Sequence, residues 1–272
     1  MWKDDTVYNA PSISPYESFF GEDLNGDGSI GIDVSKLSAV GSDTAGVALM
    51  RDSDGGLYLV DGTGSAAIAT VIGNAGWMEY SNSWGNGSNK REAIAIESVK
   101  EGGIVTGFKL ALKNTNKYDT NPDQVTYDIL SLNTEGKQVY GTGGAMMGMG
   151  GGSDANVYGA KSLSPYETMF NEDFNGDGII GVDVSKLVKV TTDTTGVTLA
   201  RDPEGGLYLI SAAGNQATAV GNAGWLEYNN SYNTTDYYKR EAIAVEALSD
   251  GSGYKLAMKT TSKWGGNAEQ ET

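Results

Sequence analysis

The chain has 272 residues, a formal net charge of −16, and neither cysteine nor histidine. The charge argues against nucleic acid as a partner, because phosphates would be repelled rather than neutralised, and the lack of cysteine and histidine excludes disulfides, thiolate chemistry and the usual catalytic triads. No run of about 18 apolar residues is present, so no membrane span is expected. An acidic chain suits divalent cations, salty media and basic partners, and solubility alone is the alternative explanation of the charge.

The first predicted element is a short helix from Pro15 to about Phe20. The letters SPYE at 14–17, repeated at 164–167, have the spacing of a capping box with proline at the first helical position. This interpretation makes Glu17 and Glu167 bond back to the start of their own helices. Both are also candidates for a further cation ligand.

An acidic, glycine-rich loop follows each predicted helix: DLNGDGSIGID at 23–33 and DFNGDGIIGVD at 173–183. Side-chain oxygens at alternate positions, a glycine at the sixth and a main-chain carbonyl at the seventh are typical of an EF-hand-like loop around calcium. The eighth residue, Ile30 or Ile180, is expected to anchor the loop in the protein. The predicted calcium ligands are Asp23, Asn25, Asp27, Ser29 and Asp33 in the first loop, and Asp173, Asn175, Asp177, Ile179 and Asp183 in the second.

The twelfth loop position departs from the EF-hand pattern. Val34 and Val184 stand where a bidentate glutamate is usual, while Asp33 and Asp183 lie one position earlier. Two alternatives stay open: these aspartates close a tighter loop, or the last ligand comes from elsewhere or from water. Incomplete ligation predicts one weak calcium site per loop, with a Kd of roughly 10⁻⁴ to 10⁻³ M, the range of extracellular modules.

After the loops the pattern becomes β. VALMR and LYLV flank the turn DSDGG and predict a hairpin, IAIESV and FKLALK alternate as strands do, and a further hairpin is expected around Asn133–Gly136. Apart from the short helix there is no helical periodicity. The predicted fold is mainly β, with two tandem antiparallel β units, each preceded by a short helix and an EF-hand-like calcium loop.

The chain is a tandem repeat, in which TVYNAPSISPYE at 6–17 matches NVYGAKSLSPYE at 156–167 and FKLALK at 108 matches YKLAMK at 254. The predicted organisation is a first unit at 1–140 (helix and calcium loop 14–34, β module 35–140), a Gly/Met-rich linker at 141–155, and a second unit at 156–272 (helix and calcium loop 164–184, β module 185–272). The second unit is shortened at its C-terminal end. Either the chain belongs to a longer array, or a neighbouring chain supplies the strands.

Aromatic residues form two clusters: Trp77, Tyr80 and Trp84, and Trp225, Tyr228 and Tyr232. They are candidate contacts for sugar rings, and packing within a thin β core is the alternative. Acidic residues on the alternating strands predict cross-strand ion pairs rather than a glycosidase carboxylate pair, so no enzyme activity is expected. These acids are Glu79, Glu92, Glu97, Glu227, Glu241 and Glu246.

The order DLNGDG after YESFF, then GGLYLV, GW, REAIAIE and GFKLALKNTNKYD, resembles the tryptophan-rich domain repeated in large cyanobacterial and other bacterial exoproteins. The resemblance covers most of both units. The loop alone also resembles half of a dockerin, but no second helix follows it. The resemblance implies secretion, calcium binding and a surface or matrix role, and it implies no catalytic residues.

These features together predict a calcium-stabilised structural or interaction protein of the cell surface or extracellular matrix, able to assemble into an array or filament. The alternative is a carbohydrate-binding adhesin module that uses the aromatic clusters. The expected partners are calcium together with neighbouring copies of the chain or surface glycans. The N-terminal sequence has no apolar segment typical of a signal peptide, so the secretion route is not visible in it.

Overall fold

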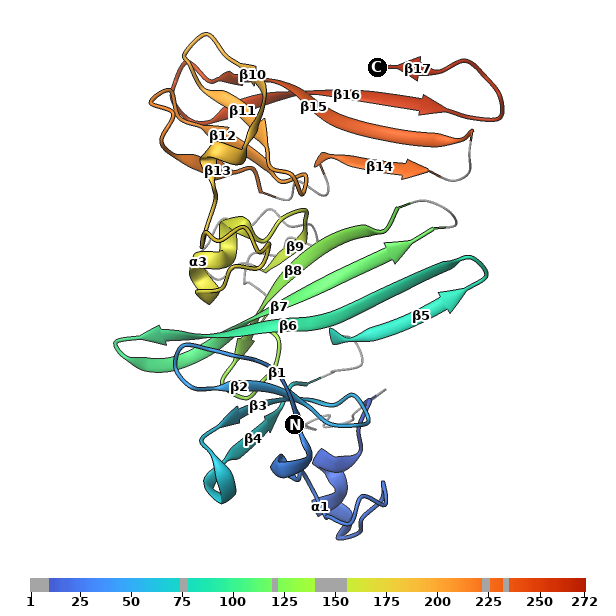
Figure 1. Cartoon of the computed structure of the whole chain (residues 1–272), viewed down its shortest axis with the longest axis vertical. Coiled ribbons are helices and arrows are strands. Elements are labelled where there is room, and N and C mark those ends of the chain that lie inside the picture. The colour runs from blue at the N-terminus through green and yellow to red at the C-terminus, as the bar shows by residue number, and fades with distance from the viewer. Residues whose placement is uncertain (1–9, 74–77, 119–121, 140–155, 222–225, 232–234) are drawn as a thin grey trace, which may run out of the picture. The chain divides into compact units, whose positions relative to one another are not determined.

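The computed structural model describes residues 10–73, 78–118, 122–139, 156–221, 226–231 and 235–272. Within these ranges the chain is mainly β, with four antiparallel sheets and two short α-helices (Figure 1). The prediction of a mainly antiparallel β fold is confirmed. The Gly/Met-rich segment predicted at 141–155 lies outside the described residues.

Each repeat has a helical turn directly before its acidic loop. In the first repeat a 3₁₀ turn at Ser14–Tyr16 leads into α1 (Glu17–Phe20), and in the second a 3₁₀ turn at Ser164–Tyr166 leads into α3 (Glu167–Phe170). The helices end at once because the next residue, Gly21 or Asn171, adopts the left-handed conformation, with φ of 68° and 52°. This confirms the predicted helix.

A small four-stranded sheet follows each loop, with strands paired in chain order. Its strands are β1 (Ser38–Ser42), β2 (Ala48–Arg51), β3 (Leu57–Asp61) and β4 (Ile68–Val71) in the first repeat, and β10 (Val188–Thr192), β11 (Thr198–Arg201), β12 (Leu207–Ile210) and β13 (Ala217–Ala219) in the second. Further 3₁₀ turns lie at Val34–Lys36, Gly64–Ala66 and Val184–Lys186. The pairing of β2 with β3 confirms the hairpin predicted at DSDGG.

A second sheet in each repeat contains the longest strands (Figure 1). In the first of these sheets the strands are β5 (Tyr80–Trp84), β6 (Gly87–Glu101), β7 (Ile104–Lys117), β8 (Gln124–Asn133) and, from the start of the second repeat, β9 (Val157–Ala160). In the second they are β14 (Tyr228–Ser231), β15 (Tyr237–Ala247), β16 (Tyr254–Lys263) and β17 (Gln270–Glu271). The turn predicted at Asn133–Gly136 is confirmed by a 3.0 Å hydrogen bond from the Gly136 N–H to the Asn133 carbonyl.

The chain divides into two compact units whose boundaries run through β5 to β8. One unit consists of Met1–Asn82, Asn89–Asn114 and Ile129–Asn156, and the other of Ser83–Ser88, Thr115–Asp128 and Val157–Thr272. Strand β9 begins the second repeat in sequence, yet it joins the sheet of β8. The compact units and the sequence repeats therefore do not share all their boundaries.

In each small sheet, a buried tyrosine packs against the turn that joins the second and third strands. Tyr58 is fully buried and its hydroxyl donates a 2.7 Å hydrogen bond to the Asp52 carboxylate; burial raises the pKa of this phenol. A Cβ on Gly56 would lie 2.6 Å from that hydroxyl, so only glycine fits there. Tyr208 and Asp202 repeat the arrangement at 2.7 Å. This packing explains why both copies read GGLYL.

In the second repeat, Leu199 and Leu207 of the small sheet pack with Ala242 and Val245 of β15 to form a buried apolar cluster. Large-to-small changes in such a cluster typically cost about 2–5 kcal/mol of unfolding free energy. Among the described residues, no helix has the length and apolar character needed to cross a membrane.

Candidate metal centre

The buried carboxylate of Glu17 holds the first acidic loop in place. One of its oxygens accepts hydrogen bonds from the N–H groups of Leu24 (2.9 Å) and Asn25 (3.1 Å). The other oxygen accepts from the Gly31 N–H at 2.9 Å, and the residue is completely buried. A single side chain therefore ties the start of the loop to its end.

The second repeat builds the same arrangement. The carboxylate of Glu167, also completely buried, accepts from the N–H groups of Phe174 (3.0 Å), Asn175 (3.3 Å) and Gly181 (2.9 Å). The predicted capping box is therefore wrong in both copies. The reason is physical: three loop N–H groups need an acceptor in a buried place, and the glutamate meets all of them instead of the helix start.

Asp23 shapes the loop from within. Its Oδ1 accepts from the N–H groups of Gly26 (2.7 Å) and Asp27 (3.1 Å), and its Oδ2 accepts from Gly28 at 2.8 Å. Asp173 makes the equivalent bonds to Gly176, Asp177 and Gly178 at 2.7, 3.1 and 2.8 Å. The first aspartate thus curls the backbone so that the following side chains turn toward one centre.

A lysine ammonium lies at that centre. In the first loop the Lys36 Nζ is 3.4 Å from the Asp27 Oδ1 and 3.5 Å from the Asp33 Oδ2. It also donates to the Asp27 carbonyl oxygen at 2.5 Å and to the Ser29 hydroxyl at 3.1 Å. These four partners are all oxygens, so this point of the loop attracts a cation.

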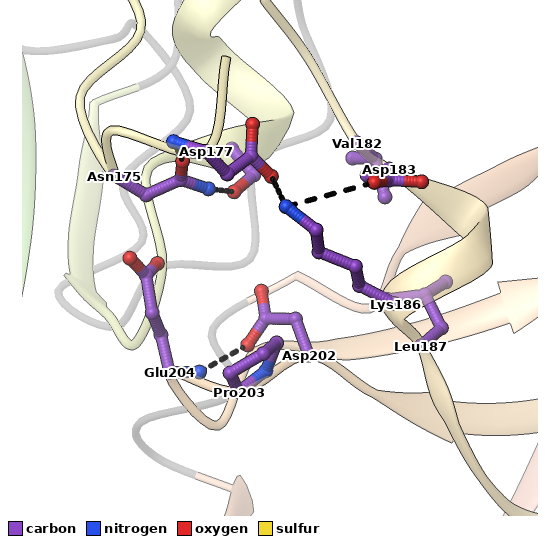
Figure 2. Close-up of a pocket in the computed structure, with 10 residues that line it drawn as sticks. Asn175, Asp177, Val182, Asp183, Lys186, Leu187, Asp202, Pro203 and Glu204 are labelled. Atoms are coloured by element: carbon purple, nitrogen blue, oxygen red, sulfur yellow. Dashed lines mark hydrogen bonds and ion pairs between the residues drawn. The ribbon is translucent and has the colours of Figure 1, made fainter. Parts of the chain in front are cut away.

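The second loop repeats this arrangement. The Lys186 Nζ is 3.4 Å from the Asp177 Oδ2 and 3.8 Å from the Asp183 Oδ2, and Figure 2 shows the side chain reaching between the two carboxylates. In both repeats the lysine comes three residues after the last aspartate of the loop. In each repeat, therefore, an equivalent pair of aspartates faces the ammonium group of an equivalent lysine.

The two carboxylate oxygens of Asp33 contact different partners. Its Oδ1 caps the next 3₁₀ turn by accepting from the Ser35 N–H (3.0 Å) and hydroxyl (2.6 Å), while its Oδ2 faces Lys36. The Ser35 hydrogen bonds lower the pKa of this carboxyl, and the equivalent Ser185 bonds lower that of Asp183. The ionised form is thus favoured, and the Oδ2 of Asp33 is directed into the loop, where it also accepts a 3.2 Å hydrogen bond from the Ser29 hydroxyl.

Asn25 links the loop to the small sheet. Its Oδ1 accepts from the Asp27 N–H at 3.0 Å, and its amide donates to the Ser14 hydroxyl (2.9 Å) and the Asp54 carboxylate (3.4 Å). Asn175 donates to Ser164 in the same way, at 2.9 Å. Since Asp54 belongs to the turn between β2 and β3, a second element of each repeat approaches the loop.

Sequence reasoning missed the acids on this turn. In the second repeat a pocket of about 210 Å³ opens between the loop and the turn, lined by Asp177, Asp183 and Lys186 on one side and by Asp202 and Glu204 on the other (Figure 2). The pKa of the Glu204 carboxyl is raised, mainly by burial and further by nearby carboxylates. The sequence does contain a signal for these acids, because the equivalent turns RDSDGG and RDPEGG both carry an acidic residue at their fourth position.

The oxygen ligands that the loop offers fit a hard cation such as calcium only in part. Asp27 and Asp33 direct oxygens to a common positive charge, whereas Asp23 and Asn25 already accept loop N–H groups and would contribute remaining lone pairs. Over the described residues, no group of three or more acidic, cysteine or histidine side chains is gathered closely enough to hold a metal ion. A calcium site here would therefore also need amide and backbone carbonyl oxygens, as EF-hand loops do.

The expected anchoring role of Ile30 and Ile180 is wrong. The two side chains are 57% and 44% exposed. An EF-hand loop buries its eighth residue through pairing with a partner loop, and among the described residues neither loop pairs with a strand or with another loop. Each loop is held by its buried glutamate instead.

The aromatic clusters are only partly within the described residues, because Trp77, Trp225 and Tyr232 lie outside them. Tyr228 is half-buried and stacks on Tyr238, with ring centroids 5.5 Å apart. Tyr80 is 37% exposed. Trp84 is 47% exposed and lies beside Tyr118, which is 45% exposed, at a centroid distance of 6.3 Å.

The acids on the strands are engaged in local contacts. Glu79 pairs with Arg51 of β2 and accepts the Ala93 N–H at 2.7 Å, and Glu227 pairs with Arg201 at 2.5 Å. Lys90 pairs with Glu92, Lys239 with Glu241, and threonine hydroxyls at Thr44 and Thr194 donate to Glu97 and Glu246. The prediction of cross-strand ion pairs is wrong for Glu92 and Glu241, whose lysine partners lie two residues away on the same strand, β6 or β15. Glu79 and Glu227 pair with arginines of other elements, Arg51 of β2 and Arg201 of β11.

No family model matches the chain, and neither the curated proteins nor the solved structures contain a significant match. The resemblance to the tryptophan-rich exoprotein domain stays a prediction from sequence.

We predict that Glu17→Gln destabilises the first loop by about 1–3 kcal/mol, because the amide that replaces one carboxylate oxygen faces an N–H donor. Hydrogen exchange at the amides of Leu24, Asn25 and Gly31 measures this, and all three should exchange faster. Glu22→Gln, at an exposed position in the same turn, is the control. Equal exchange in both variants would contradict the role assigned to Glu17.

Proposed function

We propose that this chain is a calcium-stabilised structural and interaction protein of the cell surface or extracellular matrix. The observation that carries the proposal is the oxygen-lined centre of each loop, where Asp27 with Asp33, or Asp177 with Asp183, surrounds a lysine ammonium. The resemblance to secreted repeat domains adds the extracellular setting. One calcium ion per repeat would join the helix, the loop and the neighbouring turn.

In this proposal the chain's own residues do the positioning. Glu17 and Glu167 fix the two ends of each loop, and Asp23 and Asp173 curl it. The acids of the β2–β3 turn, or of β11–β12 in the second repeat, are the nearest source of the ligand missing from position twelve. Bound calcium would neutralise a concentration of carboxylates that otherwise repel one another, and so would stabilise the folded state.

Calcium should raise the melting temperature of the chain. At about 10 mM calcium and a Kd of roughly 1 mM, each site contributes about 1.4 kcal/mol, or a shift of about 3 °C. EGTA should reverse the shift, and the double variant Asp27→Asn with Asp177→Asn should abolish it. Asp61→Asn, on an exposed strand end, is the matched control. A melting temperature unaffected by calcium would rule the proposal out.

Replacing Lys186 separates a calcium site from a plain ion-pair cluster. If calcium competes with the ammonium for the same carboxylates, Lys186→Met should tighten calcium binding by roughly 5-fold, because a like charge near the ion is removed. Isothermal calorimetry measures the affinity, with Lys189→Met on the exposed face of β10 as the control. Weaker calcium binding in Lys186→Met would show that the lysine supports the site instead.

Carbohydrate binding is the second candidate, favoured by the neighbouring and exposed rings of Trp84 and Tyr118. Apolar sugar faces stack on such aromatic platforms. A glycan array should then give signals that Trp84→Ala removes and that Trp264→Ala, another half-exposed tryptophan, leaves unchanged. An array without signal would exclude carbohydrate binding and leave the structural role as the single proposed function.

A further inference from the structure

The sequence contains three Asn–Gly pairs, and two of them lie in the acidic loops. These two are Asn25–Gly26 and Asn175–Gly176, and the third, Asn86–Gly87, lies at the turn between β5 and β6. An Asn–Gly pair is prone to lose its side-chain amide without any catalyst, because glycine has no side chain that shields its backbone nitrogen. Whether the folded loops expose or protect these pairs depends on the partners of the glycine N–H groups.

Deamidation of such a pair requires the glycine nitrogen to attack the asparagine side chain. In the first loop, the Gly26 nitrogen would give up its proton and form a bond to Cγ of Asn25. The bond between Cγ and Nδ2 would break, and the amide would leave with that proton as ammonia. Water would then open the cyclic succinimide at either of its carbonyl groups, which gives aspartate or isoaspartate, so that water is the single co-reactant.

The folded loop engages the nitrogen that this reaction needs. The Gly26 N–H donates a 2.7 Å hydrogen bond to Oδ1 of Asp23, and the Gly176 N–H donates a bond of the same length to Oδ1 of Asp173. Loss of the proton would break a hydrogen bond to a charged acceptor, which is one of the stronger kinds. It would also create an amide anion beside a carboxylate, and like-charge repulsion opposes this. The aspartates therefore keep the attacking nitrogen in its unreactive form.

The asparagine side chain is held as well. Oδ1 of Asn25 accepts a hydrogen bond from the Asp27 N–H at 3.0 Å, and the Asn25 amide donates to the Ser14 hydroxyl at 2.9 Å. Asn175 makes the equivalent bonds, both at 2.9 Å. Release of the amide as ammonia would break the bond to the serine. An ordered loop thus opposes the reaction at the leaving group as well as at the attacking nitrogen.

The other oxygen of Asp23 covers a second reactive pair in the same loop. Asp–Gly pairs form the same succinimide, with water as the leaving group. The Gly28 N–H, which follows Asp27, donates a 2.8 Å hydrogen bond to Oδ2 of Asp23. Asp173 accepts the equivalent bond from the Gly178 N–H, also at 2.8 Å. One carboxylate in each loop therefore engages two glycine nitrogens that follow an asparagine or an aspartate.

We propose that Asn25 and Asn175 are deamidation sites that Asp23 and Asp173 keep inert while the loops are folded. A loop that opens loses this protection, and the reaction is then irreversible because ammonia is lost. The modification thus marks loops that have been open. The inference goes beyond the calcium proposal and does not depend on it.

Either product would alter the loop in which it forms. Isoaspartate at position 25 would add a methylene group to the backbone before Gly26 and so displace this N–H from Asp23. Aspartate would place a negative charge next to the Asp54 carboxylate, which accepts a 3.4 Å hydrogen bond from the Asn25 amide. Like-charge repulsion would replace that hydrogen bond.

The first test compares the folded chain with the unfolded chain. The full chain is incubated at mildly alkaline pH with EGTA, with or without guanidinium chloride, and deamidation is followed by peptide mapping and mass spectrometry. Asn25 and Asn175 should react at least roughly 10-fold more slowly in the folded chain, the effect of a hydrogen bond to a charged group. Equal rates in the two states would overturn the proposal. EGTA removes calcium from both, so the result is independent of the proposed calcium sites.

In the second test each loop is the control for the other. Asp23→Ala removes the acceptor of the glycine N–H, so Asn25 should deamidate roughly 10-fold faster while Asn175 keeps its rate. Asp173→Ala should have the reverse effect. Asp61→Ala, at the exposed end of β3, should change neither rate. Equal acceleration of both asparagines by one variant would overturn the local role of each aspartate.

Hydrogen exchange distinguishes lost protection from an opened loop. If the amides of Leu24 and Gly31 stay slow in Asp23→Ala, their bonds to Glu17 persist and the loop is still held. Faster deamidation of Asn25 in this held loop supports the proposal. If the loop opens instead, Asn25 should reach the rate of the unfolded chain. A rate that stays at the value of the unmodified folded chain would overturn the proposal in both cases.

Discussion

The structure of each repeat depends on one buried carboxylate. Glu17 and Glu167 are completely inaccessible to water, and each accepts three backbone N–H groups from the loop that follows its helix. Burying a carboxylate is costly unless hydrogen bonds compensate for the lost water. Three N–H donors supply this compensation here. In return the glutamate fixes the loop backbone, so that the aspartates that follow point toward a shared centre.

That arrangement explains how a helix of a single turn can organise an EF-hand-like loop. An EF-hand holds its loop between two helices and against a partner loop. In this protein the second helix and the partner loop are replaced by a buried glutamate on one side and by the acidic turn of a small β-sheet on the other. Within the described residues no second helix follows either loop, and the proposed stabilising role, rather than that of a sensor, rests on this.

The long sheets add a second property that is independent of the loops. In the first of these sheets β7 pairs with β8 and β8 with β9, whereas over the described residues β16 is paired on the equivalent side only near its C-terminal end, with β17.

The sequence by itself determined the repeat, the helix, the antiparallel β character, the hairpins and the identity of the loop acids, because these depend on local spacing and on comparison of the chain with itself. Only the tertiary structure decided the partners of Glu17, the exposure of Ile30 and the approach of Glu204 to the second loop. Each of these depends on which distant groups meet. A capping box and a loop anchor are sequence patterns of a few neighbouring residues. A buried carboxylate, in contrast, accepts hydrogen bonds from the N–H groups that the fold brings next to it, and these can lie far away in the sequence.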